Sequence, residues 1–241
     1  MNGSESKKHG RTKTGSEKEV MKILSTWRKN FSENTFICKF AIMKEYTTER
    51  HPLEPFLPDG ARILMLGSFP PKKERWSMDF FYPNFINDMW RIMGLIFFND
   101  KEHFIAEDAS GSKARRFDKE RCVSFAAEKG IAMYDTACEV IRLKDNASDK
   151  FLEVVTATNV TELLERLPSC QAVVTTGQKA TEVMTERFGC REPQVGGFTE
   201  FEAAGRTVRL WRMPSSSRAY PLSIERKAEK YRIMFEKENM I

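Results

Sequence analysis

Two segments far apart in the chain carry side chains that could hold a flat polar ligand and a phosphate together. Residues 67–71 read Gly-Ser-Phe-Pro-Pro, and residues 213–217 read Met-Pro-Ser-Ser-Ser. Glycine allows a sharp turn, while proline stiffens the turn and removes a backbone donor. Hydroxyl groups and the remaining backbone N–H groups can bind phosphate oxygens. Taken alone, each segment also fits a rigid loop without chemistry, so the interpretation depends on what surrounds it.

Aromatic rings and cations alternate directly after the first segment. Rings stack on nucleic-acid bases and cations contact phosphates, so this mixture is typical of a nucleic-acid site. The alternative is that most of these rings belong to the core, which the helical spacing of Trp90 favours for that residue. The residues concerned are Lys72, Lys73, Arg75, Trp76, Phe80, Phe81, Tyr82, Phe85, Trp90 and Arg91.

Asn84 and Asn87 lie in the same stretch. A side-chain amide offers both a donor and an acceptor. It can therefore read the edge of uracil or hypoxanthine, or hold a water molecule as nucleophile. Asn87 also stands where a helix is expected to begin, and asparagine is a favourable N-cap. Ligand chemistry and helix capping are both open for Asn87 at this point.

The predicted elements explain how the two segments could meet. Apolar runs predict strands and apolar periodicity predicts helices in alternation, which indicates an α/β fold with a mostly parallel sheet covered on both faces. Ligands bind beyond the carboxyl ends of such strands. Because both segments follow strands, we expect them to share one site. The strands are expected at 62–66, 131–134, 172–176, 199–203 and 207–213, the last two as a hairpin, and the helices at 87–97, 118–129, 159–167, 178–188 and 223–238, with Ser223 as an N-cap.

The chain is expected to have three parts. Residues 1–20 are polar and charged, which predicts a disordered tail. Residues 21–58 are expected to be an N-terminal extension, in which Met43 is an alternative translation start. Residues 59–241 are expected to form a single α/β domain. The N-terminus lacks the apolar stretch of a signal peptide, and the apolar runs are too short to span a bilayer.

The net charge of +5 and the pI of about 8.9 suit a polyanionic partner without requiring one. The five cysteines are odd in number and widely spaced, with no Cys-x-x-Cys pair. This pattern predicts free thiols in a reducing, cytoplasmic compartment, and neither a zinc site nor an iron–sulfur cluster.

Together the two segments resemble the signature motifs of the uracil-DNA glycosylase superfamily. The first match is Gly-x-x-Pro at 67–70, followed by Pro-Asn at 83–84 and Asn-x-x-Trp at 87–90. Mismatch-directed members carry asparagine where this chain has Phe69, and the aspartate that activates water in the uracil-specific branch is missing from the loop. The pattern is closer to the hypoxanthine-directed branch, which implies Asn87 as the catalytic residue and Phe69 as a wall of the base pocket.

The second segment resembles the corresponding motif of the thymine- and mismatch-directed branch, with the same five residue types. This implies that Pro214 fixes the loop against a flipped nucleotide while the serines bind its phosphates. Arg218 and Leu222 are candidates for the wedge that fills the gap in the duplex. Lys179, at the start of a predicted helix, could meet a further phosphate.

The resemblance spans residues 60–235 and implies a three-layer α/β/α sandwich around a mostly parallel four-stranded sheet. Asp135 ends a predicted strand where members of the superfamily place a polar residue near the base, although a turn cap is the alternative. The expected base pocket comprises Gly67, Ser68, Phe69, Pro70, Tyr82, Asn84 and Asp135. The expected DNA contacts are Lys179, Pro214, Ser215, Ser216, Ser217, Arg218 and Leu222.

The implied activity is that of a monofunctional DNA glycosylase, which flips a deaminated base, uracil or hypoxanthine, and hydrolyses its N-glycosidic bond. No cofactor and no metal is expected, the partner is damaged or mismatched DNA, and the resemblance implies a monomer. A non-catalytic reader of damaged or single-stranded DNA on the same fold is the alternative, supported by the departures in the first motif. A serine hydrolase fits less well, because no Gly-x-Ser-x-Gly is present and His9, His51 and His103 are the only histidines.

Overall fold

The computed structural model describes residues 47–143 and 151–241. All of them belong to one compact unit that begins at Thr47. The tail expected at 1–20, Met43 and most of the extension expected at 21–58 lie outside the described residues. Residues 47–58, the remainder of that extension, pack in the same unit as the α/β domain.

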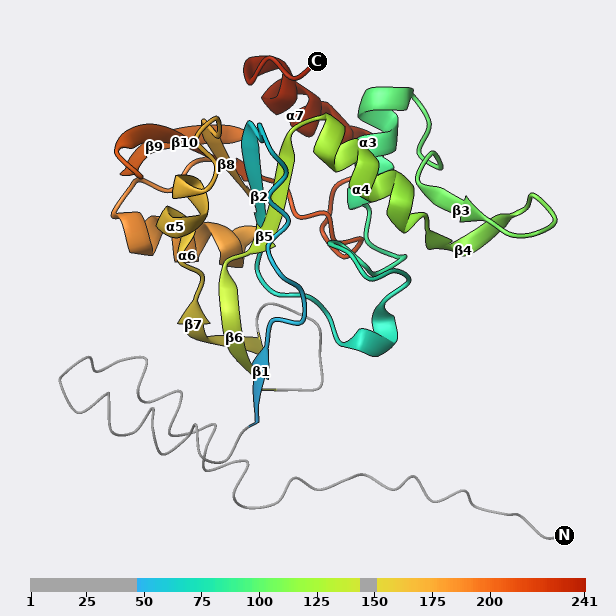
Figure 1. The fold of residues 1–241 in the computed structure, drawn as a ribbon, viewed down its shortest axis with the longest axis horizontal. Helices are drawn as coiled ribbons and strands as arrows, with labels where there is room; N and C mark the ends of the chain where they lie inside the picture. The colour runs from blue at the N-terminus through green and yellow to red at the C-terminus, as the bar shows by residue number, and fades with distance from the viewer. Residues whose placement is uncertain (1–46, 144–150) are drawn as a thin grey trace, which may run out of the picture. The chain divides into compact units, whose positions relative to one another are not determined.

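A five-stranded sheet forms the centre of the fold (Figure 1), in the order β5-β2-β8-β10-β9. The first four strands of this order run parallel to one another, which confirms the mostly parallel sheet. β9 runs antiparallel to β10 as the other arm of the predicted hairpin, so the sheet has one strand more than the four expected. The strands are β2 (Ile63–Gly67), β5 (Ile131–Asp135), β8 (Ala172–Thr176), β9 (Gly197–Ala203) and β10 (Arg206–Met213).

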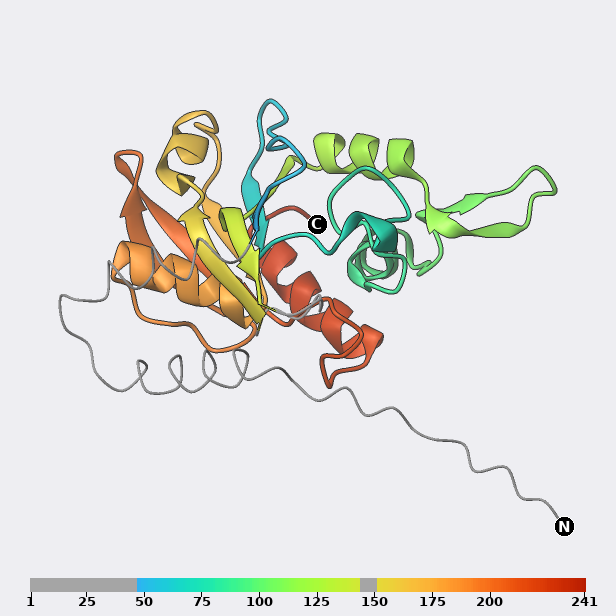
Figure 2. The same ribbon diagram turned by 90° about the horizontal axis from the view of Figure 1, so that it is seen from below.

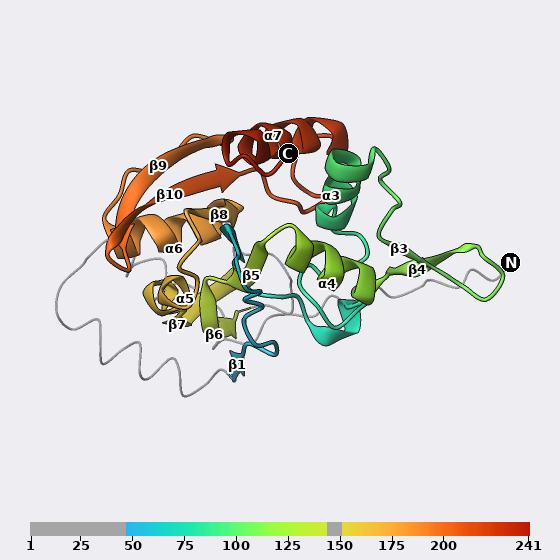
Figure 3. The same cartoon turned by 45° about the horizontal axis from the view of Figure 1, so that its top comes forward.

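Helices cover both faces of the sheet, which gives three layers (Figures 1 and 2). On one face lie α3 (Met89–Phe98), α4 (Lys119–Glu128) and α7 (Ile224–Lys237). On the other lie α5 (Val160–Glu165) and α6 (Gln178–Phe188), a separation that Figure 3 also shows.

Two of the predicted helix starts carry side-chain caps. The Asp118 carboxylate accepts a hydrogen bond from the backbone N–H of Arg121, and the Ser223 hydroxyl accepts one from the backbone N–H of Arg226. Each bond satisfies a backbone donor that the first turn of a helix leaves unpaired. The N-cap predicted at Ser223 is confirmed.

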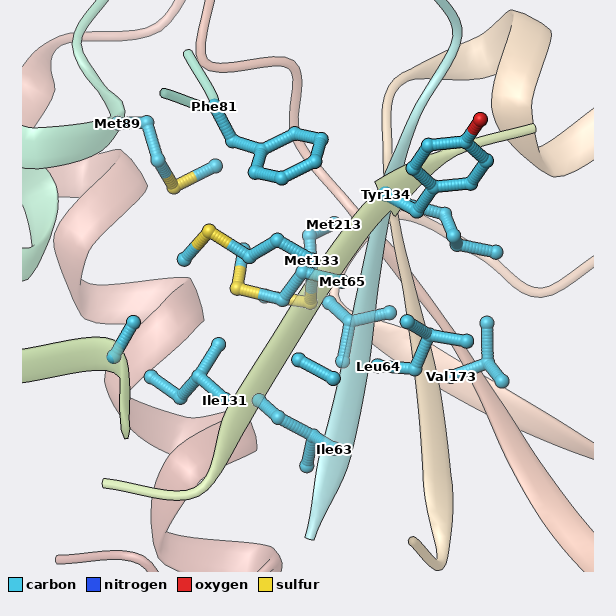
Figure 4. Packing of buried hydrophobic residues seen from close by; sticks show 14 of the residues in the cluster. Ile63, Leu64, Met65, Phe81, Met89, Ile131, Met133, Tyr134, Val173 and Met213 are labelled. Carbon is cyan, nitrogen blue, oxygen red and sulfur yellow. The ribbon is translucent and has the colours of Figure 1, made fainter. Parts of the chain in front are cut away.

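The core forms on both faces of the parallel strands, because every residue of β2, β5 and β8 is buried. Side chains alternate along a strand. Met65 and Met133 therefore point toward the layer of α3 and α7, while Leu64 and Val173 point to the other side (Figure 4). A sheet buried on both faces reads as a continuous apolar run in the sequence, and this run positions the polar residues that follow each strand.

Two smaller sheets were not expected from the sequence. β1 (Thr48–Arg50), β6 (Ala137–Arg142) and β7 (Leu152–Ala157) form an antiparallel sheet beyond the end of β5. β3 (Ile105–Glu107) and β4 (Lys113–Phe117) form a hairpin between α3 and α4. A 3-10 turn, η1 (Lys73–Arg75), follows the first motif. The first of these sheets is the one that matters for the site, because it fixes the chain before β2 against the chain after β5.

Among the residues that the structure describes, no helix is long and apolar enough to cross a membrane. Within the same residues, no group of three or more His, Cys, Asp or Glu side chains could hold a metal ion.

Candidate functional site

The carboxyl ends of four parallel strands meet at one edge of the sheet. Gly67 ends β2 and pairs in register with Asp135, which ends β5. Thr176 ends β8 and pairs in register with Met213, which ends β10. The loops after β2 and β10 are the first and second motifs, so the fold brings both to the same edge, as the alternation of strands and helices predicts.

Gly67 is required by its contact with Asp135. A Cβ atom at position 67 would lie 2.3 Å from Oδ1 of Asp135 and 3.9 Å from the Thr176 hydroxyl oxygen. No side chain tolerates the first of these distances, so glycine is the residue that lets the carboxylate lie directly on the backbone. The start of the first loop and the carboxylate therefore form one compact unit.

Asp135 is bound to a histidine that the prediction of the site did not include. Oδ2 of Asp135 lies 2.8 Å from Nε2 of His51, and the two side chains are 11% and 2% exposed. The other ring nitrogen of His51 lies 2.8 Å from the carbonyl oxygen of Leu53. The sequence showed His51 only as an isolated histidine before a proline. No local pattern could have revealed the pairing, because its partner is 84 residues away.

Phe69 packs against this pair. Its ring meets the His51 ring edge to face, with centroids 5.4 Å apart, and the Tyr134 ring lies 4.6 Å from His51 on another side. Pro70 is buried, and its carbonyl oxygen accepts a hydrogen bond from Arg142. Gly67 and Phe69 therefore contact the carboxylate–imidazole pair, with Ser68 half-buried between them and Pro70 held by Arg142.

Arg142, in β6, supports the first loop through its contacts with Phe69 and Pro70. Its guanidinium group makes a bidentate ion pair with Glu49 of β1, with distances of 2.9 Å, and lies 5.9 Å from the centre of the Phe69 ring. The side chain is buried and one of its nitrogens, Nη1, has no hydrogen-bond partner. The antiparallel sheet of β1, β6 and β7 thus holds Phe69 and Pro70 in place.

Tyr82 closes the other side of the strand ends. Its hydroxyl forms a 3.1 Å hydrogen bond with the hydroxyl of Thr176, and its backbone adopts a left-handed φ of 53°. Burial of the hydroxyl raises the pKa of Tyr82 far above its usual value, which outweighs the opposing effect of the Thr176 hydrogen bond. The phenol is therefore a neutral donor or acceptor in the site.

Asn87 is not the N-cap of α3, which is Asp88, but it lies directly before that residue and contacts the start of the helix. Its Oδ1 atom accepts a hydrogen bond of 2.9 Å from the backbone N–H of Met89, at the start of α3. Asn84 similarly accepts a bond from the backbone N–H of Ile86. Each side-chain oxygen thus accepts one hydrogen bond within the loop, so its second lone pair and the amide nitrogen are the groups that could meet a ligand.

A buried ion pair joins the two motifs. Asp88, next to Asn87, accepts a bond of 2.9 Å from Lys227 of α7, and Lys227 also donates to the carbonyl oxygen of Ser217 at 2.8 Å. The backbone N–H of Asp88 donates to the carbonyl oxygen of Ser216. In the sequence, Lys227 is one of many lysines on an amphipathic helix, and nothing distinguished it.

The residues of the second loop differ in their exposure to solvent. Tyr231 holds the carbonyl oxygen of Pro214, Ser216 is buried, and Ser217 is exposed. Ser215 is half-buried beside the start of α6, where a Cβ atom at Gly177 would lie 3.7 Å from it. Lys179, in the first turn of α6, is half-buried near this point. The serine best placed to reach a phosphate in solution is therefore Ser217.

Arg218 and Leu222 line an open cleft of about 430 Å³ beside the ion pair. Arg91 also lines it, and burial, with the neighbouring charge of Arg218, lowers the pKa of Arg91. The other lining residues are Asp88, Lys101, Glu102, Ser223 and Ile224. Arg218 also pairs with Asp88 at 3.4 Å. Three cationic side chains face two carboxylates in this lining, so a small excess of positive charge favours an anionic ligand here.

The aromatic residues of the first motif divide into two groups. Phe80, Phe81 and Trp90 are buried, as the helical spacing of Trp90 predicts. Trp76 and Phe85 instead line a second open hollow, of about 420 Å³, together with Asn84 and cationic side chains. Lys73 lies 3.9 Å from the centre of the Trp76 ring. Rings on the surface and rings in the core therefore follow one another within this stretch.

No protein-family model matches this chain, and no curated protein matches it. Among solved structures, it is similar to a protein of Methanosarcina acetivorans that is described as a candidate uracil DNA glycosylase and was solved by NMR in solution. The TM-score is 0.51 at 18% sequence identity, over 80% of this chain and 99% of that chain. At this identity the likeness concerns the fold.

Proposed function

We propose that this protein is a DNA glycosylase that flips a deaminated base, uracil or hypoxanthine, out of DNA and hydrolyses its N-glycosidic bond. One observation carries the proposal. The loop of Phe69, the carboxylate of Asp135 and the hydroxyl of Tyr82 converge at the ends of adjacent strands, next to the loop of the second motif. The fold shared with the Methanosarcina protein supports the same choice.

The two sides of the site have different tasks in this proposal. A flipped base enters beside Phe69 and is read by polar groups at its Watson–Crick edge. The second loop and the cleft take the DNA backbone, with Ser217 and Lys179 on phosphates. Arg218 and Leu222 enter the duplex where the base has left, because inserted side chains offset part of the lost stacking.

Hydrolysis requires a positioned water molecule and stabilisation of charge. The sugar gains oxocarbenium character and the leaving base gains negative charge. Asn87 holds the water through its amide group, and the backbone N–H groups of Ser68 and Phe69 face a base carbonyl. Lys227, the buried lysine beside the second loop, is held by Asp88 and Ser217, so we expect base release without strand incision.

A second function is favoured by one contact. The Oδ1 atom of Asn87 is already bound to the backbone N–H of Met89, so one lone pair remains to accept a hydrogen bond from water, and a neutral amide does not take up a proton as an ionised carboxylate does. A protein with this arrangement could bind a flipped base without cleaving it. This is the non-catalytic reader of damaged or single-stranded DNA.

The test is a panel of labelled oligonucleotides that carry uracil, hypoxanthine, xanthine or thymine opposite each normal base. Each is incubated with the protein in EDTA, and abasic sites are then cleaved with alkali. We expect base release by the wild type, and a loss of about 100-fold or more in Asn87→Ala. Asn159→Ala is the matched control, because Asn159 also precedes a helix but is bound to Arg187 and Glu162. Binding of these DNAs without any base release would support the reader instead.

A further inference from the structure

The pair of His51 and Asp135 is built into the site from two distant parts of the chain. His51 is almost fully buried, and its Nε2 atom lies 2.8 Å from Oδ2 of Asp135. Its Nδ1 atom is also within hydrogen-bond distance of the backbone of Leu53. A buried imidazole with both nitrogens engaged has one orientation, so it fixes the rotation of the carboxylate that it binds.

The chain that carries His51 is anchored on both sides. The backbone N–H of His51 donates to the carbonyl oxygen of Cys138 at 2.8 Å, directly after β1 pairs with β6. Further along, Phe56 and Met133 exchange two backbone hydrogen bonds, of 3.0 and 2.9 Å. The segment 47–57 is therefore a fixed wall of the site, tied to the strand that ends in Asp135.

The second oxygen of the carboxylate faces the first loop. Oδ1 of Asp135 lies where a side chain at Gly67 would begin, 2.3 Å from the Cβ position, and the Thr176 hydroxyl lies 3.9 Å from the same position. His51 holds Oδ2. One oxygen is thus held by the imidazole, and the other lies against the backbone of Gly67 at the end of β2, on a side chain that is 11% exposed.

Building on the proposed function, we infer that His51 is a positioning residue and that Asp135 reads the base through a ring N–H. An ionised carboxylate accepts hydrogen bonds and donates none. Cytosine N3 and adenine N1 carry lone pairs, whereas the corresponding atoms of uracil and hypoxanthine carry hydrogens. A fixed acceptor at this point therefore selects the deaminated base over its parent, and it does so only while the carboxylate stays in the orientation that His51 sets.

The hydrogen bond from His51 also reduces the repulsion between the Asp135 carboxylate and the departing base. The base departs with developing negative charge, which an isolated carboxylate would oppose. A ring N–H bound to Oδ2 draws part of the charge of the carboxylate away from Oδ1. His51 thus supports both recognition and departure of the base.

The experiment compares a base that has the ring N–H with its deaza analogue, in which C–H replaces N–H and the shape is kept. Of uracil and hypoxanthine, the better substrate of the full-length protein is used. Single-turnover rates are then measured for this base and for its deaza analogue. Three proteins are compared: wild type, His51→Gln and His51→Asn. Glutamine places an amide N–H near the position of Nε2, whereas asparagine reaches only the position of Nδ1 and leaves Asp135 unsupported.

We expect the wild type and His51→Gln to prefer the N–H base strongly, because a site built to hydrogen-bond a substrate N–H rejects an analogue that lacks it. In His51→Asn this preference should fall by at least about tenfold, mainly through the rate of base release. Dividing the preference of the variant by that of the wild type cancels any difference in intrinsic reactivity between the two leaving groups. Thermal unfolding shows whether both variants are folded. The glutamine and asparagine side chains are close in size and polarity, so each variant serves as a control for the other.

Two results would overturn the assignment in distinguishable ways. If the wild type releases neither base, the proposed function itself is wrong, and the assignment falls with it. If the wild type releases the N–H base and His51→Asn keeps the full preference, the glycosylase stands but His51 does not position Asp135.

Discussion

The Nζ atom of Lys227 lies 2.9 Å from Oδ2 of Asp88, and both side chains are buried. The same ammonium group donates to the carbonyl oxygen of Ser217. The start of α3, which follows the first motif, is therefore joined to the loop of the second motif by this lysine. Asp88 adds two further links, an ion pair with Arg218 at 3.4 Å and a backbone hydrogen bond to Ser216. Two halves of the site that are distant in the sequence meet at Asp88.

Replacing Lys227 by methionine should lower the free energy of unfolding by roughly 3 kcal/mol, because the buried carboxylate of Asp88 then keeps only its longer contact, of 3.4 Å, with the exposed Arg218. Urea unfolding followed by circular dichroism measures this. Asp88→Asn combined with Lys227→Met should recover a large part of the loss, since no unpaired charge remains. Equal stability of the single and double variants would show that the pair is not coupled.

Gly67→Ala should disable the site, because the new Cβ atom would lie only 2.3 Å from Oδ1 of Asp135 and displace it. A displacement of about 1 Å at a reacting centre can reduce the rate about 100-fold, and single-turnover base release measures the effect. Adding Asp135→Ala removes the clash, so the double variant should regain stability without regaining activity. A Gly67→Ala protein with full activity would contradict the close approach of the loop and the carboxylate.

Arg218→Ala should weaken binding to duplex DNA, because the inserted side chain offsets part of the lost stacking. It should also reduce the slope of log affinity against log salt by up to about one unit, because one cation is removed from the DNA interface. Fluorescence anisotropy over a salt series measures both. Arg187→Ala is the matched control, because this exposed arginine lies in the last turn of α6, about 15 Å along the helix from the second loop. Equal slopes for the wild type and Arg218→Ala would remove Arg218 from the DNA contacts.

Tyr82→Phe should cost about 1 kcal/mol at neutral pH through the lost hydrogen bond to Thr176. The pKa of Tyr82 is raised in the folded protein from the ordinary value of 10.0. Above about pH 10 the unfolded chain releases this proton while the folded protein keeps it, so stability falls as pH rises. Unfolding curves at neutral and alkaline pH should therefore show a shallower alkaline loss in the variant. The same loss in both proteins would contradict the burial of this hydroxyl.

The sequence was sufficient to predict those elements that a local pattern of residues determines. The apolar runs before Gly67 and Asp135 predict β2 and β5, and the capping serine at 223 predicts the start of α7. The parallel order of the strands then places the two motifs at one edge. These features depend on neighbours in the chain, which a single sequence displays.

The remaining features depend on partners distant in the chain. β1 pairs with β6 although neither strand has a strong alternating pattern, and the resulting sheet positions His51 beside Asp135. Lys227 is buried by the loop that it binds, while Glu225 and Arg226, directly before it on α7, are exposed. In both cases a common residue type gains its role from tertiary contacts, which no periodicity encodes.

The central claim is tested most directly by mass spectrometry of a uracil- or hypoxanthine-containing oligonucleotide after incubation with the wild-type protein, without alkali. A glycosylase should leave an intact strand whose mass has fallen by that of the free base less one water molecule, which hydrolysis adds to the sugar, together with the free base in solution and no strand incision. Full binding of the oligonucleotide with its mass unchanged, for every deaminated base offered, would contradict the account and make the protein a reader.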